Sequence, residues 1–349
     1  YIESGWASNN KNIDIPNNKT IWKIEGNSKL TPNDDVTLIW KNNQGLTFEK
    51  IIKIDNQYLF TIEQKIKNSS DKIYSFYPYA QIIRTKIPEI IDFFILHEGP
   101  LGVLDDQLIE KDYKDILDKK YSINANDGFL GITDKYWLTS IIPQKNKKFR
   151  ADFEYNEKFK VNYIETDSYE SKPNTQISNL VNVVVAAKEV NVIDGYNESL
   201  GLKKFDLVID WGWFYWIVKP LFFLNDYFFK LAGNYGIAII LITVCLRLAF
   251  FPLNNYAFKS MSRMKLVQPE MARLKEIHKD DKMKLQQAMM QLYKKEGINP
   301  VSGCLPILIS IPFFFAIYKM LFVTIEMRHQ PFFGWIKDCL LYTSDAADE

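Results

Sequence analysis

The strongest constraint on the fold is an apolar stretch at residues 231–258, which contains one formal charge, Arg247. A helix needs about 20 consecutive apolar residues to cross a bilayer, and this stretch is longer than that. A charged side chain at the centre of a membrane costs about 3 kcal/mol on insertion scales, so it is expected to face protein or a water-filled cavity and not lipid. The pattern predicts a transmembrane helix in which Arg247 is a functional residue.

The composition of the chain changes near residue 204. Residues 1–204 are polar and rich in Asn, Lys and Ile, whereas residues 205–325 are dominated by aromatic and aliphatic runs. A mean hydropathy of −0.18 conceals this division. The formal net charge of +1 gives no sign of general nucleic-acid binding, and the three cysteines form neither a disulfide framework nor a metal-ligand spacing. We therefore expect two different parts, one in water and one in the membrane, with buried thiols.

Residues 1–204 read as a large antiparallel β-sandwich. Short runs of β-branched and aromatic residues alternate with Asn, Asp, Gly and Ser clusters that turn a chain. Strands are expected at 20–25, 36–40, 46–54, 58–66, 73–79, 129–132, 136–142, 150–153, 159–165 and 180–187. Residues 107–119 are polar and fit either a loop or a surface helix. The three histidines are scattered, and the carboxylates show no spacing that favours acid/base catalysis over a solvated face.

The amino-acid composition of residues 205–230 differs from that of residues 1–204. Eleven of these residues are aromatic, and Asp210, Lys219, Pro220 and Asp226 interrupt every apolar run before it could span a bilayer. Trp and Tyr favour the headgroup region because their rings are amphipathic. We interpret this segment as an interfacial amphipathic helix that leads into the span at 231–258. A buried helix of a soluble core is the alternative.

A basic segment follows at 259–299, with 10 Lys and Arg against 5 Asp and Glu. Apolar residues recur at helical spacing on both sides of a polar break at 278–281. This pattern predicts a hairpin of two amphipathic helices. Pro269 is expected to bend the first helix or to delay its start, because an interior proline loses a hydrogen bond.

A second transmembrane helix is expected at 300–325, with Pro306 and Pro312 distorting it. An excess of Lys and Arg in a short loop marks the cytoplasmic side, so the hairpin between the two spans is placed in the cytoplasm and the sandwich outside it. Tyr1 is not preceded by a methionine, and no signal peptide is visible. We therefore expect a fragment or a processed chain whose parent has an upstream signal or anchoring helix.

Long ordered segments of the chain resemble the YidC/Oxa/Alb membrane protein insertase family, in its Gram-negative bacterial form. The similarity covers nearly all of residues 1–338, which is far more specific than a short motif. It is carried by VTLIWKNNQGLTFEK at 36–50, GFLGITDKYWLTSIIP at 128–143, AAKEVNVIDGY at 186–196, FDLVIDWGWFYWIVKPLF at 205–222, YGIAIILITVCLRLAFFPL at 235–253, the stretch from MARLKEIHKDDK to AIYKMLF at 271–322, and PFFGWIKD at 331–338.

The resemblance implies a multidomain membrane protein, with a periplasmic antiparallel β-supersandwich followed by an α-helical membrane core. Two spans of that core are visible and the remainder is missing. The implied division is 1–204 for the periplasmic domain, 205–230 for the interfacial helix, 231–258 for the first span, 259–299 for the cytoplasmic hairpin, 300–325 for the second span and 326–338 for the start of a periplasmic segment.

In this family the membrane core encloses a hydrophilic groove, open to the cytoplasm and to lipid. The family's groove arginine matches Arg247, and a nearby polar position matches Thr243, one helical turn away. The following span contributes a hydrophobic slide for incoming transmembrane segments. The matching positions there are Pro306, Ile311, Pro312 and Phe314.

The resemblance also implies a function without a covalent step, cofactor, nucleotide or metal. The protein is expected to be a multi-pass protein of the bacterial inner membrane that inserts and helps fold membrane proteins, alone or with the Sec translocon. Nascent membrane proteins and the lipid bilayer are the implied partners, with ribosome or targeting-factor contact through the hairpin. An equal alternative for any single lysine of the hairpin is that it only sets topology.

Residues 339–349 depart from the family, which continues with further spans after the position of Asp338. We interpret this tail as the product of a truncated or chimeric reading frame, and we expect the groove of the chain as it stands to lack several walls. Two other functions remain open from the sequence. One is a carbohydrate-binding or carbohydrate-processing periplasmic domain on a membrane anchor, and the other is a transmembrane receptor.

Overall fold

The computed structural model describes residues 1–88, 96–279, 281–297 and 305–338. The chain divides into two units. Unit 1 holds Tyr1–Asp210 with Val323–Ile325, and unit 2 holds Trp211–Phe322 with the residues from Glu326 onward. The tail at 339–349, the start of the second span at 300–304, and the thiols of Cys304 and Cys339 lie outside the described residues.

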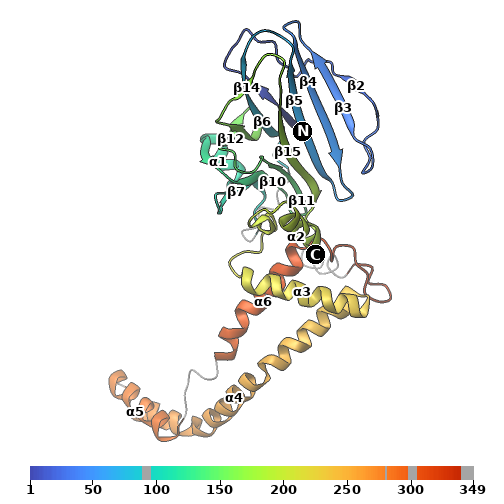
Figure 1. Cartoon of the computed structure of the whole chain (residues 1–349). Helices are drawn as coiled ribbons and strands as arrows, with labels where there is room; N and C mark the ends of the chain where they lie inside the picture. The colour runs from blue at the N-terminus through green and yellow to red at the C-terminus, as the bar shows by residue number, and fades with distance from the viewer. Residues whose placement is uncertain (89–95, 280, 298–304, 339–349) are drawn as a thin grey trace. The chain divides into compact units, whose positions relative to one another are not determined.

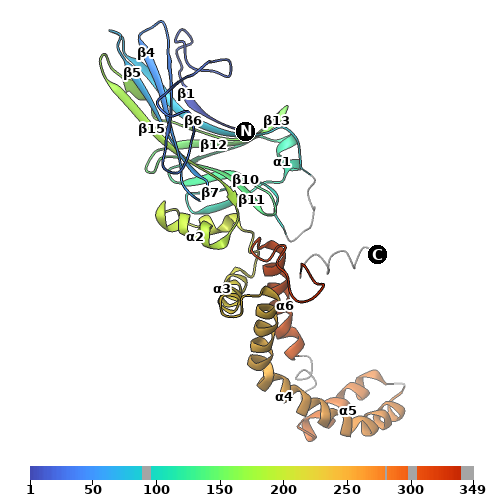
Figure 2. The same cartoon turned by 90° about the vertical axis from the view of Figure 1, so that its right-hand side faces the viewer.

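Unit 1 is a sandwich of two antiparallel sheets, which confirms the predicted fold (Figures 1 and 2). The first sheet runs in the order β1 (Ile2–Ala7), β6 (Tyr74–Arg84), β13 (Lys158–Glu165), β12 (Phe149–Asn156) and β9 (Tyr121–Ala125), with β14 (Tyr169–Ser171) pairing β6. The second runs in the order β2 (Lys23–Glu25), β3 (Val36–Lys41), β4 (Leu46–Ile54), β5 (Leu59–Asn68), β15 (Gln176–Ala187), β11 (Trp137–Ile142), β10 (Gly128–Thr133), β7 (Gly99–Leu104) and β8 (Gln107–Glu110).

All ten strands expected from the sequence are present, with boundaries that differ by a few residues. The sequence did not reveal β1, β7, β9 or β14, which are short; glycine, proline or charged residues also interrupt the apolar alternation of β1, β7 and β14. The undecided segment at 107–119 contains two elements. It begins as β8 and continues as the short helix α1 (Tyr113–Asp118), whose Tyr113 and Ile116 are buried.

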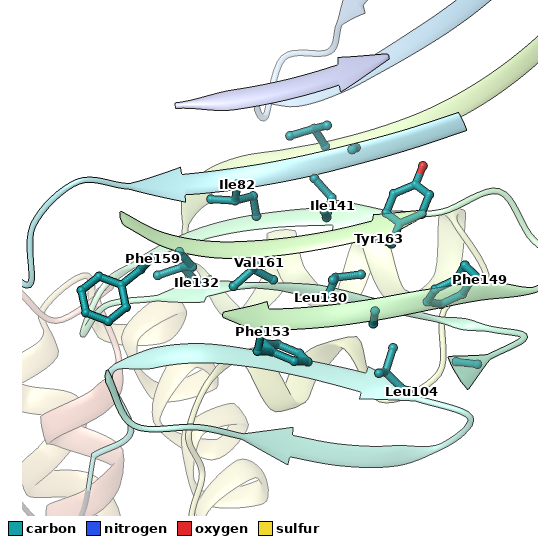
Figure 3. Close-up of a cluster of buried hydrophobic side chains, with 14 of the residues drawn as sticks. Ile82, Leu104, Leu130, Ile132, Ile141, Phe149, Phe153, Phe159, Val161 and Tyr163 are labelled. Atoms are coloured by element: carbon teal, nitrogen blue, oxygen red, sulfur yellow. The ribbon is translucent and has the colours of Figure 1, made fainter. Parts of the chain in front are cut away.

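The core of the sandwich follows from period-two burial along the strands. In β13, Phe159, Val161 and Tyr163 are buried while their neighbours are only partly buried. They join residues from the facing sheet, such as Leu130 and Ile132, in one cluster of buried apolar side chains (Figure 3). Burying one such side chain contributes about 1.5–3 kcal/mol, so the two sheets are held mainly by this apolar interior.

One carboxylate of β13 lies on the same side of the strand as its core residues. Glu165 follows Tyr163 on the same face and is 1% exposed. Its two oxygens accept hydrogen bonds from Asn179 Nδ2 at 2.7 Å and from the Tyr169 hydroxyl at 3.0 Å. Burial raises the pKa of the Glu165 carboxyl, and these two hydrogen bonds and Lys147 oppose that effect.

Unit 1 extends beyond the boundary expected at residue 204. The helix α2 (Val190–Ser199) is followed by the single 3-10 turn η1 (Phe205–Val208), and Phe205 is fully buried against Phe129 with ring centroids 4.8 Å apart. The expectation that 205–230 forms one interfacial helix was therefore wrong at its start. The aromatic residue that seemed to begin that helix instead packs on the sandwich.

Unit 2 contains four helices among the described residues: α3 (Tyr215–Ala232), α4 (Tyr235–Ile277), α5 (Lys282–Lys295) and α6 (Leu305–Val323). The expected boundaries at 230/231 and 258/259 are not helix boundaries. The chain breaks instead at Gly233, which has φ +66° and ends α3 in the left-handed conformation, and at Asn234, which begins α4. The span and the first hairpin helix are one helix.

The predicted helical hairpin is present at the end of α4 (Figure 1). Val267 of α4 and Leu292 of α5 form its apolar contact, and Asp281 caps α5 by accepting a hydrogen bond from the Lys284 backbone N–H at 3.1 Å. Pro269 does not delay a hairpin helix, because α4 passes through it without interruption. Tertiary packing of the apolar face sustains the helix despite the lost hydrogen bond.

Glu165 generates a prediction about pH. Because its folded pKa is raised, the folded state binds more protons than the unfolded state just above the ordinary carboxyl pKa, and stability falls as pH rises through that window. Relative to Glu165→Gln, the free energy of unfolding of the natural protein should decrease from pH 4.5 towards neutrality, by at most about 1.4 kcal/mol per pH unit. Urea denaturation followed by tryptophan fluorescence at a series of pH values measures this difference.

The control is Glu170→Gln, which changes an exposed carboxylate on the neighbouring β14. This variant should follow the natural protein at every pH. A Glu165→Gln variant whose stability changed with pH in parallel with the natural protein would contradict the assignment.

Candidate functional site on the apolar helices

Helix α3 has two faces of different character. Ile217, Val218, Leu221 and Phe222 are buried, while the opposite face exposes aromatic rings including Trp216 and Tyr227. Rings that are apolar but carry one polar atom suit the boundary between lipid and water. The observed helix is therefore compatible with the interfacial position expected from the sequence, beginning at Tyr215 and not at residue 205.

The start of α4 is held by a junction centred on Asn234. Its Oδ1 accepts a hydrogen bond from the Ile237 backbone N–H at 3.1 Å, and its Nδ2 donates to the carbonyls of Pro331 at 3.2 Å and Phe332 at 3.0 Å. A Cβ on Gly236 would lie 2.2 Å from the Phe332 ring, so only glycine permits this approach. One side chain thus caps the helix and fixes the returning chain after α6.

Two helices of the described residues are long and apolar enough to cross a membrane, α4 and α6. These are the segments in which the sequence predicted its two spans. Mean hydropathy over the most apolar window is 2.3 in α4 and 2.0 in α6, and most of each window is not buried inside the structure. Long exposed apolar helices are unfavourable in water, which supports burial in lipid or against further helices.

Arg247 lies 12 residues into α4, about 18 Å from Tyr235 along the helix axis. It is exposed, and within the described residues it makes neither a hydrogen bond nor an ion pair. Val244, Leu248 and Phe251 surround it in sequence and are exposed by 48, 67 and 64%. The guanidinium is therefore a single unpaired cation within an apolar surface, where a low-dielectric environment would strengthen its attraction for an anion.

Thr243 stands one turn before Arg247 and is also exposed. Its hydroxyl donates to the Ile239 carbonyl at 2.8 Å, the usual way in which threonine satisfies its hydroxyl on a helix. The oxygen can still accept a hydrogen bond. Thr243 and Arg247 therefore share one helical face, as the i, i+4 spacing predicted.

The four α6 positions assigned to the slide do not share one environment. Pro306 is buried and Pro312 is partly buried, while Ile311 and Phe314 are 55 and 58% exposed. Pro306 follows Leu305, the first described residue of α6. Pro312 lies inside the helix, which continues through it to Val323.

Helices α4 and α6 meet through Phe250 and Phe313, whose ring centroids are 5.0 Å apart in a T-shaped arrangement. Phe250 follows Arg247 by three residues and Phe313 precedes Phe314. This ring contact lies one turn from Arg247 on α4 and next to Phe314 on α6. No direct contact between Arg247 and any of the four slide positions is found in the part of the chain that the structure describes.

Sequence analysis missed several buried polar residues of unit 2. Asn225 is fully buried in α3, where its Nδ2 lies 3.7 Å from the Met327 sulfur and its Oδ1 has no partner among the described residues. Asp226 is 8% exposed and forms an ion pair with Lys230 at 2.7 Å. Lys319 of α6 is 3% exposed. The sequence pattern identifies Asp226 only as an interruption of an apolar run, although a buried charge is a stronger signal than an interruption.

Cys245 differs from its expected state. It is exposed on α4, beside the apolar residues that flank Arg247. No other helix of the described residues covers this face, so the thiol is not part of a core.

Within the described ranges no group of three or more His, Cys, Asp or Glu side chains is placed to hold a metal ion. His97, the most buried histidine, is held by Asp112 at 3.6 Å and by the Pro100 carbonyl at 3.2 Å. What α4 presents is one cation, Arg247, and one hydroxyl, Thr243, among exposed apolar side chains.

Comparison with known families gives two matches, whose boundary lies within helix α3 of unit 2. Residues 1–224 match the family described as YidC periplasmic domain, and residues 227–344 match the family described as 60Kd inner membrane protein. The chain belongs to the YidC family. The sandwich is therefore the periplasmic domain of a YidC protein, and the apolar helices are part of an inner membrane protein.

Curated YidC relatives agree with this assignment. The membrane protein insertase YidC of Pelagibacter ubique is 64% identical over 337 residues, covering 97% of this chain and 60% of the relative. The protein of the same name from Nitrobacter hamburgensis is 46% identical, covering 97% of this chain and 58% of the relative. The chain thus spans about 60% of the length of the curated YidC relatives it matches.

Among solved structures, the sandwich is similar to a galactose mutarotase related enzyme from Lactobacillus acidophilus. The TM-score is 0.36 at 10% identity, covering 48% of this chain and 71% of that one. A TM-score this low carries no information about the function of the YidC chain.

The Asn234 junction of this YidC chain can be separated into its two roles by substitution. Asn234→Ser keeps a helix-capping oxygen but loses the two donors to Pro331 and Phe332, whereas Asn234→Ala loses both. Losing a cap costs about 1 kcal/mol, and losing the donors leaves two carbonyls unpaired. Limited proteolysis of the full-length protein should cut at 328–338 faster in both variants, while amide exchange at Ile237 should increase in Asn234→Ala alone. Faster exchange at Ile237 in both variants would show that the two roles are not separable.

Proposed function

We propose that the full-length protein of this chain is a membrane protein insertase that also helps inner-membrane proteins to fold, and that it acts by binding and not by covalent chemistry. The names of its curated relatives support this function. The substrates would be nascent membrane proteins, whose segments combine polar flanks with apolar spans. No nucleotide, metal or other cofactor is required by the proposed mechanism.

The observation that carries the proposal is the state of Arg247. It is an unpaired cation 12 residues inside an apolar helix and is surrounded by exposed apolar side chains. A charge in this position is costly unless it meets water or an anion, and intramembrane charges mark ion or substrate pathways. We assign the hydrophilic groove to Arg247 and Thr243.

The mechanism follows from the two helices. An acidic flank of the incoming segment is attracted to Arg247, and the water around that charge shortens the distance over which the flank would cross hydrocarbon. The apolar part of the segment leaves along α6, where Ile311 and Phe314 are exposed and Pro306 and Pro312 complete the slide. Burial of apolar surface, at about 25 cal/mol per Å², and the membrane potential acting on the flank supply the driving force.

The basic hairpin supports a topology and a set of partners. We propose a multi-pass protein whose hairpin lies in the cytoplasm, because α4 and α5 carry the excess of Lys and Arg described above. Its exposed cations, such as Arg273 and Lys275, would attract the ribosome or acidic targeting factors by long-range electrostatics. Association with the Sec translocon is the remaining partner that we propose for the full-length protein.

Substitution of Arg247 tests the groove. Arg247→Ala in the full-length protein should reduce insertion of a small membrane protein with an acidic translocated tail about tenfold, since a lost interaction of about 1.4 kcal/mol corresponds to that factor. Arg247→Glu should reduce it further by repulsion, and Arg247→Lys should retain most of the activity. Protease protection of the translocated tail in inverted membrane vesicles measures insertion.

The matched control is Arg263→Ala, which removes an exposed arginine from the hairpin end of the same helix. Insertion in this variant should equal that of the natural protein. A substrate whose tail has been neutralised should be insensitive to Arg247→Ala, and equal losses for acidic and neutral tails would exclude charge attraction as the role of Arg247.

Photo-crosslinking tests the path of the substrate. A photoreactive amino acid at Thr243 or Phe314 of the full-length protein should form adducts with a nascent chain arrested during insertion, since both positions are exposed on the proposed path. The same amino acid at Met261, which is also exposed on α4 but lies in its hairpin half, should give far fewer adducts. Adduct yields are read by gel electrophoresis, and absence of adducts at both path positions during active insertion would remove the groove assignment.

A further inference from the structure

A row of polar side chains crosses the second sheet of unit 1. In the strand register, Gln64 of β5 lies directly opposite Lys50 of β4 on one side and Asn179 of β15 on the other. Side chains of directly opposed residues lie on the same face of a sheet, so the three form one row. Gln64 and Asn179 are buried, and Lys50 reaches a residue of the facing sheet, so the row lies on the inner face.

Apolar residues lie on both sides of this row. Side chains on one face of a strand repeat every second residue, and two positions from the row are Ile62 and Ile66 on β5, and Val181 and Ile177 on β15. Ile62 and Val181 pack in the cluster of Figure 3, which we call the Tyr163 cluster, whereas Ile66 and Ile177 pack in a second cluster. This second cluster, which we call the Trp6 cluster, has as its buried residues Trp6, Ile13, Leu46, Phe48, Ile66 and Phe76.

The facing sheet shows the same change from apolar to polar. On β1, Ile2 packs against the Tyr163 cluster and Trp6 belongs to the Trp6 cluster, with Ser4 buried between them. On β13, Glu165 follows Tyr163 on the same face and ends the apolar series of that strand. Each sheet thus places buried polar residues where one cluster ends.

Hydrogen bonds join the two sheets at both ends of the row. The Lys50 ammonium donates to the Ser4 carbonyl, and Asn179 Nδ2 donates to the Glu165 carboxylate at 2.7 Å. Together with Gln64, these four residues form a polar layer between the Trp6 cluster and the Tyr163 cluster.

The middle of the polar layer lacks hydrogen bonds. Gln64 is fully buried, and neither its Nε2 nor its Oε1 has a partner among the described residues. Trp6 Nε1 is in the same state. Buried polar groups usually have partners, and a group without one destabilises the folded state because water satisfies it once the chain opens.

The charged members of the layer are also opposed by burial. Burial lowers the pKa of Lys50 to about 8, against the attraction of Glu3, and it raises the pKa of Glu165. Contact with water would favour the charged form of both side chains. Opening the sandwich as far as the polar layer thus recovers interactions that the closed interior lacks, which offsets part of the cost of exposing apolar surface.

The two clusters differ in how much apolar surface they bury. The Tyr163 cluster contains 17 buried residues and the Trp6 cluster contains 6. In the Trp6 cluster, Leu46, Phe48, Ile66 and Phe76 each lie within three residues of an end of β4, β5 or β6. These strand ends can separate while the rest of each strand stays paired, and a region with little buried apolar surface opens at a lower free energy.

We propose that the polar layer divides the periplasmic sandwich into two parts that open separately. The part around the Trp6 cluster opens while the part around the Tyr163 cluster stays folded, and the open form is a minor second conformation of the domain. This division is a property of the sandwich and is independent of the Arg247 groove.

Hydrogen exchange, measured by mass spectrometry on the full-length protein in lipid nanodiscs, tests the division. Relative to unprotected amides, the amides of 46–48 and 66–68 in the Trp6 part should exchange at least tenfold faster than those of 139–142 and 161–163 in the Tyr163 part. Equal protection of the two sets would overturn the proposal.

A matched pair of variants separates partial from complete opening. Ile66→Val and Ile141→Val each remove one methyl group from a fully buried side chain, the first in the Trp6 cluster and the second in the Tyr163 cluster. Ile141→Val should accelerate exchange at 139–142 about fivefold and leave 46–48 unchanged, because the contacts of Ile141 survive in the partly open form. Ile66→Val should accelerate both sets. If either variant accelerated both sets equally, the sandwich would open only as a whole and the proposal would be wrong.

A third variant tests whether the polar layer sets the division. Gln64→Leu replaces the unpartnered amide by an apolar group of similar size, so opening to the layer no longer satisfies a polar group, and exchange at 46–48 should slow at least fivefold. Gln176→Leu, which changes an exposed glutamine on β15, should leave exchange as in the natural protein. An unchanged exchange rate in a Gln64→Leu variant with a native circular dichroism spectrum would overturn the role of the layer.

Discussion

Moving a charge from water to hydrocarbon is expensive, and the organisation of unit 2 depends on how few charges its two apolar helices carry. In the apolar part of α4 the one exception is Arg247, and in α6 it is Lys319. These two residues meet the constraint differently. Lys319 is buried and has an interaction within the protein, while Arg247 remains exposed and unpaired. A paired charge can serve structure alone, whereas an unpaired one costs stability without return unless it binds something.

The same constraint explains the junction before α4. A helix that enters an apolar environment leaves four N–H groups without partners at its start, and they must be satisfied within the protein. Asn234 satisfies the Ile237 N–H and uses its remaining donors to hold the chain that returns after α6. The ends of the two candidate spans are therefore fixed to one another by a side chain whose own position is set by the capping requirement.

Much of this architecture follows from local pattern. The apolar runs at α4 and α6 are long enough to cross a membrane, and the period-two alternation of strands such as β13 is typical of a half-buried sheet. What could not be predicted depends on contacts between distant residues. Phe205 appeared to begin a membrane-surface helix because its burial against Phe129 is not visible in sequence. Likewise the sequence around Trp6 does not indicate that its indole Nε1 has no hydrogen-bond partner among the described residues, because this depends on how β1 pairs with β6. For the candidate site, Arg247 followed from its place as the single charge in an apolar run and Thr243 from the family resemblance, but the buried Asn225 followed from neither.

The continuity of α4 has a mechanical consequence. From Arg247 to Ile277 the helix extends about 45 Å at 1.5 Å per residue, so the hairpin end is a long arm attached to the residue at the centre of the span. If this arm pivoted near Arg247, a tilt of about 10° would displace its tip by about 8 Å. Pro252, five residues after Arg247, removes a backbone hydrogen bond at the point where such an arm would bend most easily. A force applied to the hairpin would in that case move the part of α4 next to Arg247.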